Sequence, residues 1–181
     1  MTVYQLIKTC CDICDIPTDQ TVFDDDISLV EASSLVGKML VAARMSMDSL
    51  YAQFAPICTS TFTAKDNQIV LPASYRVIRV QDSVGAKVAY YHTQDGIFVD
   101  GNGTYTVTYK QYFAFTSWED FVQMPLAQMS HSIMVAGTVS AYYALTSDLQ
   151  RHTSWQQVFE QATQTFRKVS SAGCLPTTNW I

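Results

Sequence analysis

Five cysteines give this 181-residue chain its widest range of possible chemistry. Cys10, Cys11 and Cys14 form a CCxxC cluster, which Cys58 and Cys174 could complete as a zinc site. Zinc-binding cysteines usually stand in paired CxxC spacings on tight turns, whereas Cys10 and Cys14 are four residues apart on an expected helix. A cysteine on an apolar stripe behaves as a small hydrophobic residue. We therefore favour core packing over metal binding or over disulfides formed later in an oxidising setting.

The three histidines, His92, His131 and His152, provide no second metal-binding pattern. They lack the HxxxH and HExxH spacings that place two imidazoles on one face of a helix. The sequence leaves open a catalytic serine or cysteine paired with one of these histidines, although no nucleophile-elbow signature is present. We therefore expect no catalytic residue, no metal and no cofactor, and interpret the chain as a non-enzyme.

The run Asp24-Asp25-Asp26 is the densest group of carboxylates in the sequence. Such a run could bind a divalent cation. Ser28 and Glu31 follow it at the spacing of a capping box, and negative charge is favourable at a helix N-terminus. We therefore favour a solvated helix start over a cation site.

The charge content is low for a protein with this much apolar sequence. Charged residues make up 15% and hydrophobic residues 48%, with a net charge of −5, whereas about 25% charged is usual for globular domains. The aromatic and apolar content excludes a disordered chain. The scattered basic residues argue against tight binding of nucleic-acid phosphates. So little charge predicts that part of the surface is covered by copies of the chain or by partners.

Neither a secretory signal nor a membrane span is expected. The N-terminus lacks a basic region followed by an apolar block, so we expect folding in reducing cytoplasm with the cysteines as thiols. The stretch between Asp120 and Asp148 is uncharged apart from His131, but polar side chains interrupt it too often for a bilayer. A buried or interface helix is the better interpretation.

Apolar spacing predicts two helices at the start of the chain. Thr2 can cap a first helix whose stripe runs from Val3 to Cys14 and ends at Ile16-Pro17. A second, strut-like helix should begin at the Ser28 capping box and reach Phe54, before Pro56.

From residue 57 to about 116 the pattern changes to the alternation of short strands, which predicts an antiparallel β module. The last strand is the clearest: Tyr105, Val107 and Tyr109 should face one way, with threonines facing the other. The run 101–103 lacks the features of a phosphate loop and is interpreted as a hairpin turn.

Two further helices are expected between residues 117 and 170. Ser117 should cap a helical region, Pro125 should begin a fresh helix, and Thr153 with Gln156 should form the capping box of the last helix. Small residues occupy one face of the helix after Pro125, which should let another backbone approach closely. They are Gly137, Ser140, Ala141 and Ala144.

The predicted fold class is α+β and mainly helical, a helical bundle with an inserted antiparallel β module and an extended C-terminal tail. One domain is expected over 1–181: two helices in 1–56, the β module in 57–116, two helices in 117–170 and the tail in 171–181. The tail is uncharged and ends in Trp180-Ile181, as a hot-spot anchor would.

This order of elements resembles the bacteriophage head-to-tail adaptor proteins of the tail tubular protein A type. The similarity is one of order and spacing over residues 3 to 170. The segments that carry it are Ile13-Cys14-Asp15-Ile16-Pro17, Leu71-Pro72 before the strand 75–80, Asp95-Gly96-Ile97-Phe98, and the run from Tyr105–Tyr109 through Phe121 and Met124-Pro125 into the helix Ala136–Ala144. The tryptophan-bearing segment that commonly follows the long helix in the family is replaced by Phe54-Ala55-Pro56.

The resemblance implies a structural virion protein, located at the neck and assembled in the host cytoplasm. It implies a twelvefold ring beneath the portal that continues the DNA channel, with DNA passing transiently and the tail or neck proteins docking below. The four small residues would pack against the neighbouring subunit, and the tail would dock on the portal. The acidic run Asp24, Asp25 and Asp26 would face the lumen of the ring. The tail residues meant are Leu175, Pro176, Asn179, Trp180 and Ile181.

Three alternatives stay open. The first is a tail terminator or another neck ring. The second is a small cysteine-dependent cytoplasmic enzyme that uses Cys58 or an N-terminal cysteine, and the third is a zinc-stabilised regulatory domain.

Overall fold

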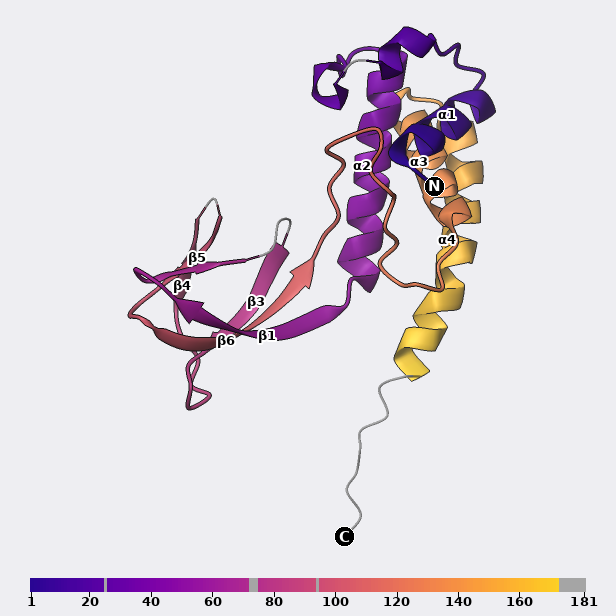
Figure 1. Ribbon diagram of the computed structural model, residues 1–181. Coiled ribbons are helices and arrows are strands. Elements are labelled where there is room, and N and C mark those ends of the chain that lie inside the picture. Colours follow the sequence, from indigo (N-terminus) through magenta and orange to yellow (C-terminus); the bar gives the residue numbers. More distant parts are fainter. Residues whose placement is uncertain (25, 72–74, 94, 173–181) are drawn as a thin grey trace. The chain divides into compact units, whose positions relative to one another are not determined.

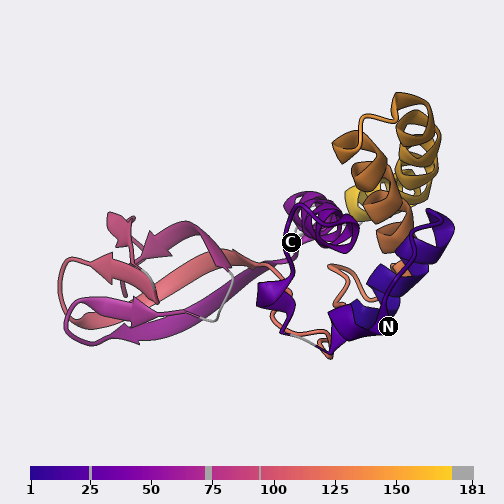
Figure 2. The ribbon, with the colours of Figure 1, turned by 90° about the horizontal axis from the view of Figure 1, so that it is seen from above.

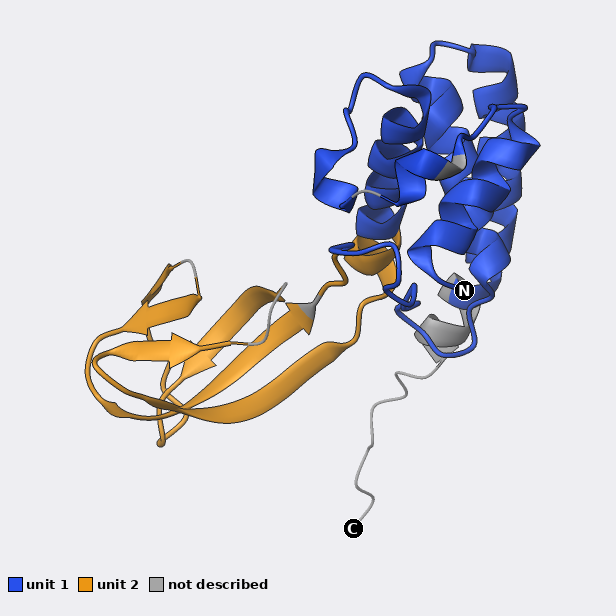
Figure 3. Ribbon diagram, turned by 45° about the horizontal axis from the view of Figure 1, so that its top comes forward, with its two compact units in different colours: residues 1–49, 115–181 blue, residues 50–114 orange. Residues whose placement is uncertain are grey.

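A computed structural model describes residues 1–24, 26–71, 75–93 and 95–172, and it shows a mixed α+β protein. The chain forms two compact units (Figure 3). One consists of residues 1–49 and the chain from 115 onward, and is called here the helical unit. The other consists of residues 50–114, and is called the β unit. The β unit is therefore inserted in sequence between two parts of the helical unit.

The helical unit contains the α-helices of the described residues, apart from the last turn of one of them. They are α1 (Val3–Ile13), α2 (Leu35–Phe54), α3 (His131–Leu145) and α4 (Leu149–Ala172), and the end of α2 belongs to the β unit. Helices α3 and α4 lie side by side, and α1 packs on α3 (Figures 1 and 2). The middle of α3 is buried almost all round, which fits its lack of charge.

The predicted start of α1 is confirmed. The Oγ1 of Thr2 accepts from the Gln5 N–H at 3.2 Å, and the Gln5 side chain accepts from the Thr2 N–H at 2.9 Å, a complete capping box. The apolar stripe is buried from Val3 to Cys11.

The helical region predicted at Ser117 is wrong. Residues 118–122 pair instead with the start of the chain: Val3 and Tyr4 donate to the carbonyls of Asp120 and Trp118, and Val122 donates to that of Met1. The Asp120 carboxylate accepts from the N–H groups of 116 and 117, which closes a turn. The first turn of α1 thus satisfies its free N–H groups on this segment.

The long helix begins later than predicted. Asp26, rather than the Ser28 capping box, caps the short 3-10 turn Ile27–Leu29, after another 3-10 turn at Gln20–Phe23. Helix α2 begins at Leu35, where the Oγ of Ser34 accepts from the Gly37 N–H at 2.9 Å. Its predicted end at Phe54 is confirmed.

The last two helices also start elsewhere than predicted. Helix α3 begins at His131 rather than at Pro125, because Ser130 provides the cap by accepting from the Ser132 N–H. Helix α4 begins at Leu149, where Asp148 accepts from the Arg151 N–H at 3.1 Å. Thr153 is therefore inside α4, and its hydroxyl donates to the Leu149 carbonyl.

The β unit contains two antiparallel sheets of three strands each. One has the order β1-β6-β3, with β1 (Ile57–Ala64), β6 (Gly103–Gln111) and β3 (Tyr75–Gln81). The other has the order β2-β5-β4, with β2 (Gln68–Val70), β5 (Gly96–Val99) and β4 (Tyr90–His92). Buried residues of both sheets form one core, which includes Ile97 and Val107.

The alternation predicted for the last strand is confirmed by β6. Tyr105, Val107 and Tyr109 point into the core, and threonines 104, 106 and 108 lie on the other side. The hairpin predicted at 101–103 is wrong, because β5 and β6 belong to different sheets. The turn instead fixes the crossing between sheets: Gly101 has a φ of 104°, and the Asn102 Oδ1 accepts from the Asn67 N–H.

Candidate functional site

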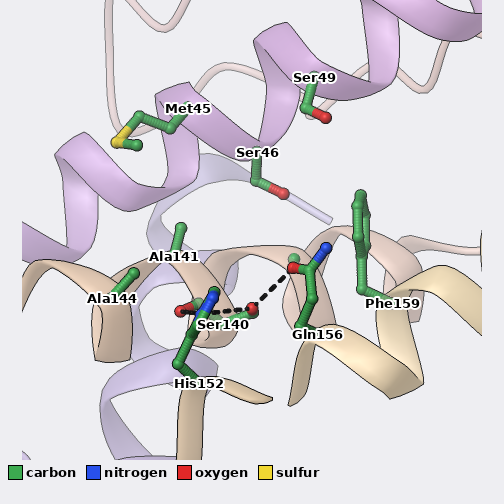
Figure 4. A pocket seen from close by; sticks show the side chains of 10 residues that line it. Met45, Ser46, Ser49, Ser140, Ala141, Ala144, His152, Gln156 and Phe159 are labelled. Carbon is green, nitrogen blue, oxygen red and sulfur yellow. Dashed lines mark hydrogen bonds between the residues drawn. The ribbon is translucent and has the colours of Figure 1, made fainter. Parts of the chain in front are cut away.

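The small residues of α3 border a hollow of about 210 Å³ inside the helical unit (Figure 4). Helices α2, α3 and α4 each contribute to its wall, and its lining residues include no aspartate, glutamate, lysine or arginine. The lining residues are Met45, Ser46, Ser49, Gly137, Ser140, Ala141, Ala144, His152, Gln156 and Phe159.

The close approach predicted for the small residues occurs within one chain. A Cβ added to Gly137 would lie 2.1 Å from the Oγ of Ser46 on α2 and 2.8 Å from the Phe159 ring on α4. Gly137 and Ser140 are buried, so they pack against their own chain and are not available to a second subunit. Ala141 is half-buried and Ala144 exposed. Their contact with another subunit stays a prediction.

A row of polar side chains on α4 ties that helix to α3. The Oγ of Ser140 donates to the Gln156 Oε1 at 3.0 Å, and the Gln156 Nε2 donates to the Glu160 Oε1 at 2.8 Å. The Nδ1 of His152 lies 3.0 Å from the Ser140 carbonyl and 3.2 Å from the Ser140 Oγ.

This arrangement does not make Ser140 a nucleophile. A carbonyl oxygen only accepts, so the His152 Nδ1 carries the proton and donates it. The Ser140 proton is directed at Gln156 instead. A general base must accept the proton of the nucleophile, and the Nδ1 of His152 cannot do so here. The row of hydrogen bonds therefore serves to join two helices.

Ser46 is one of the residues of this hollow that the sequence does not predict. Its side chain is 5% exposed, and its Oγ has no hydrogen-bond partner among the described residues. Ser46 interrupts the apolar stripe of α2, and no sequence motif around it indicates a role. Its contact with α3 becomes visible only in the tertiary structure.

The cysteines near the N-terminus are packed in the helical unit, as expected. Cys10 and Cys11 are fully buried in α1, and Cys14 is half-buried. Burial, together with the neighbouring thiols, raises the pKa of Cys10 above its usual range and that of Cys11 to about 12. Cys58 is half-buried against the core of the β unit, and Cys174 lies outside the described residues. In the described ranges, no three histidine, cysteine or carboxylate side chains are placed so that they could hold one metal ion.

Two histidines stand apart from the cysteines and from the hollow. The ring of His92 stacks on Tyr75 and meets Tyr90 edge-on within the β unit. The Nε2 of His131 lies 3.0 Å from the Val122 carbonyl and donates to it. Both histidines have a structural role.

Asp24 and Asp26, from the predicted acidic run, line a second hollow of about 250 Å³ in the helical unit. Glu119 adds a third carboxylate, and the rings of Phe23 and Trp118 form part of its wall. We call this the acidic hollow. All three carboxylates are exposed, and hydrogen bonds from Ser28 lower the pKa of Asp26. Asp25 lies outside the described residues.

The predicted docking tail is also outside them. Leu175, Pro176, Asn179, Trp180 and Ile181 are therefore candidates on sequence alone.

Among the described helices, none is both long and apolar enough to cross a bilayer. No protein-family model matches the chain, and no curated protein matches it.

Proposed function

We propose that this protein is a structural subunit of a phage neck, a ring that joins the portal to the tail and continues the DNA channel. The expected fold for that role is a helical bundle interrupted by an antiparallel β module. The observation that carries the proposal is the insertion of the β unit between α2 and α3, since this is the element order of the resembling adaptor family.

The exposed apolar side chains support a subunit that is covered by neighbours. Leu29, Phe121 and Leu149 on the helical unit, and Val84 and Tyr91 on the β unit, are at least 70% exposed. Single exposed apolar side chains are ordinary on a protein surface. Here they occur together with a low charge content, which predicts that part of the surface is covered by partners. A ring subunit covers such surfaces on both sides.

The buried thiols give little support to the cysteine-dependent alternative. A nucleophilic cysteine needs a lowered pKa and some exposure, whereas burial raises the pKa of Cys10, Cys11 and Cys14. The tail terminator remains the main alternative, because it too would form a ring.

The test is co-expression of the full chain with the portal protein encoded by the same genome, followed by electron microscopy of the purified complex. We expect a twelvefold ring on the tail-facing side of the portal. Deletion of Asn179, Trp180 and Ile181 should leave the protein folded and weaken portal attachment, whereas T177A/T178A, in the same tail, should attach normally.

Binding to the end of the tail tube, with none to the portal, would favour a tail terminator. Normal attachment of the truncated chain would remove the tail from the proposal. Failure to bind either structure would refute the neck function.

A further inference from the structure

The two units carry very different charge. The basic residues of the β unit are Lys65, Arg76, Arg79, Lys87 and Lys110, and its acidic residues are Asp66, Asp82, Asp95 and Asp100. Of the 11 basic and 16 acidic residues of the chain, six and twelve remain for the helical unit. The β unit is therefore almost neutral, and the helical unit carries the negative charge.

Four of these cations gather on the outer face of the sheet β1-β6-β3. Arg76 is paired with Lys110 and Arg79 with Thr108, and an isolated bridge places Lys87 beside Gln81. Directly opposed residues of antiparallel strands point to the same side. The threonines of β1 and β6 complete this cationic face, and its described strand positions include no carboxylate.

Arg76 and Lys110 repel each other unless a negative charge lies nearby. Like charges directly opposite each other destabilise a sheet. The Lys110 Nζ is held by the Ala52 carbonyl at 3.1 Å, and both side chains border a hollow of about 390 Å³. Within the described part of the chain, no carboxylate forms an ion pair with Arg76 or Arg79. The face is thus arranged to receive negative charge from outside it.

The acidic hollow is a fitting counterpart. Asp24, Asp26 and Glu119 present three exposed carboxylates beside the aromatic rings of Phe23 and Trp118. A guanidinium binds carboxylates through its planar fork and stacks on aromatic rings. Arginines of the cationic face match both properties.

We propose that the cationic face of one copy docks on the acidic hollow of a second copy of this chain. The two surfaces differ, so the contact is head-to-tail, and a head-to-tail contact whose rotation closes generates a ring. The inference therefore rests on the proposed function and specifies the contact between neighbouring subunits. A nucleic acid is the weaker candidate partner, since four cations offer few phosphate contacts.

The test measures self-association of the full chain by sedimentation across a range of concentrations and salt. Wild type should associate at low salt and dissociate as salt rises. R76E/R79E and D24K/E119K should each associate at least about tenfold more weakly, since charged pairs across an interface are lost. K38E/R44E is the matched control: it reverses two cations of α2 that line neither hollow and belong to no strand of the cationic face, and it should associate like wild type.

Mixing the two charge-reversed variants identifies the contact. In the mixture, the unchanged hollow of R76E/R79E can meet the unchanged face of D24K/E119K, and the two reversed surfaces also carry opposite charge. The mixture should therefore recover association that neither variant has alone. Circular dichroism of each variant checks that it is folded.

Three results would overturn the inference. They are a wild type that stays monomeric at every concentration, a mixture that fails to recover, and equal weakening by K38E/R44E. Loss of binding to duplex DNA by R76E/R79E, without loss of self-association, would assign the face to nucleic acid instead. No portal is present in this experiment, so its failure leaves the portal-binding test of the neck function unaffected.

Discussion

Gly137 decides how closely α3 approaches α2 and α4. It lies in the buried middle of α3, where any side chain would meet the Ser46 Oγ and the Phe159 ring. The sequence shows a small-residue face at this position, but small residues serve equally at contacts within a chain and between chains. Burial of Gly137 and Ser140 identifies the contact as internal.

Replacing Gly137 with alanine should lower the free energy of unfolding by about 1–3 kcal/mol, because the added methyl group overpacks a tight contact. Chemical denaturation measures the change. Gly103→Ala is the control glycine, since its Cβ would lie 3.9 Å from the Tyr105 ring, an ordinary contact.

Adding Ser46→Ala to Gly137→Ala should recover part of the loss, because it removes the atom nearest to the new methyl group and a buried hydroxyl that has no hydrogen-bond partner in the described part of the chain. Equal stability of Gly137→Ala and wild type would mean that α2 and α3 are less closely packed than described.

At the scale of single elements, helix caps separate what local sequence predicts from what it does not. The capping boxes at Thr2 and Ser28 look alike in the sequence, yet only Thr2 caps an α-helix. At the second site Asp26 captures the Ser28 N–H and closes a 3-10 turn. Helix α2 then starts from Ser34, whose hydroxyl also donates to the Glu31 carbonyl at 2.7 Å.

Ser34→Ala should therefore destabilise the protein by about 1 kcal/mol, the usual cost of losing an N-cap side chain. Ser28→Ala should change stability by a few tenths of a kcal/mol at most, since Ser28 is exposed and caps no α-helix. Thermal unfolding of the two variants measures the difference, and a larger loss for Ser28→Ala would restore the predicted capping box.

At the scale of the whole molecule, the chain builds two cores rather than one. The β unit closes its own core between two sheets, and the buried side chains of α1 and α3 belong to the helical unit. Ile97 and Met134 are both fully buried, one in each core. A cavity made in one core should therefore destabilise mainly the unit that contains that core.

Ile97→Ala and Met134→Ala should each lower the free energy of unfolding of the unit that contains the residue by about 2–5 kcal/mol, because apolar burial is lost and a cavity is left behind. Native-state hydrogen exchange should show faster exchange mainly in β5 and β6 for the first variant, and mainly in α3 for the second. Equal loss of protection throughout the chain in both variants would show instead that the two units unfold as one.

The sequence alone predicts the mixed fold class, the β insertion, the first helix with its cap, the end of α2 and the faces of β6. Those features follow from short-range periodicity and capping, which depend on neighbours along the chain. Tertiary structure decided the turn at 116–122, which pairs with the N-terminus, the starts of three helices, the two-sheet arrangement and the internal role of Gly137 and Ser140. It also brought Arg76, Arg79, Lys87 and Lys110 to one face, because strand register joins positions that lie far apart in the sequence.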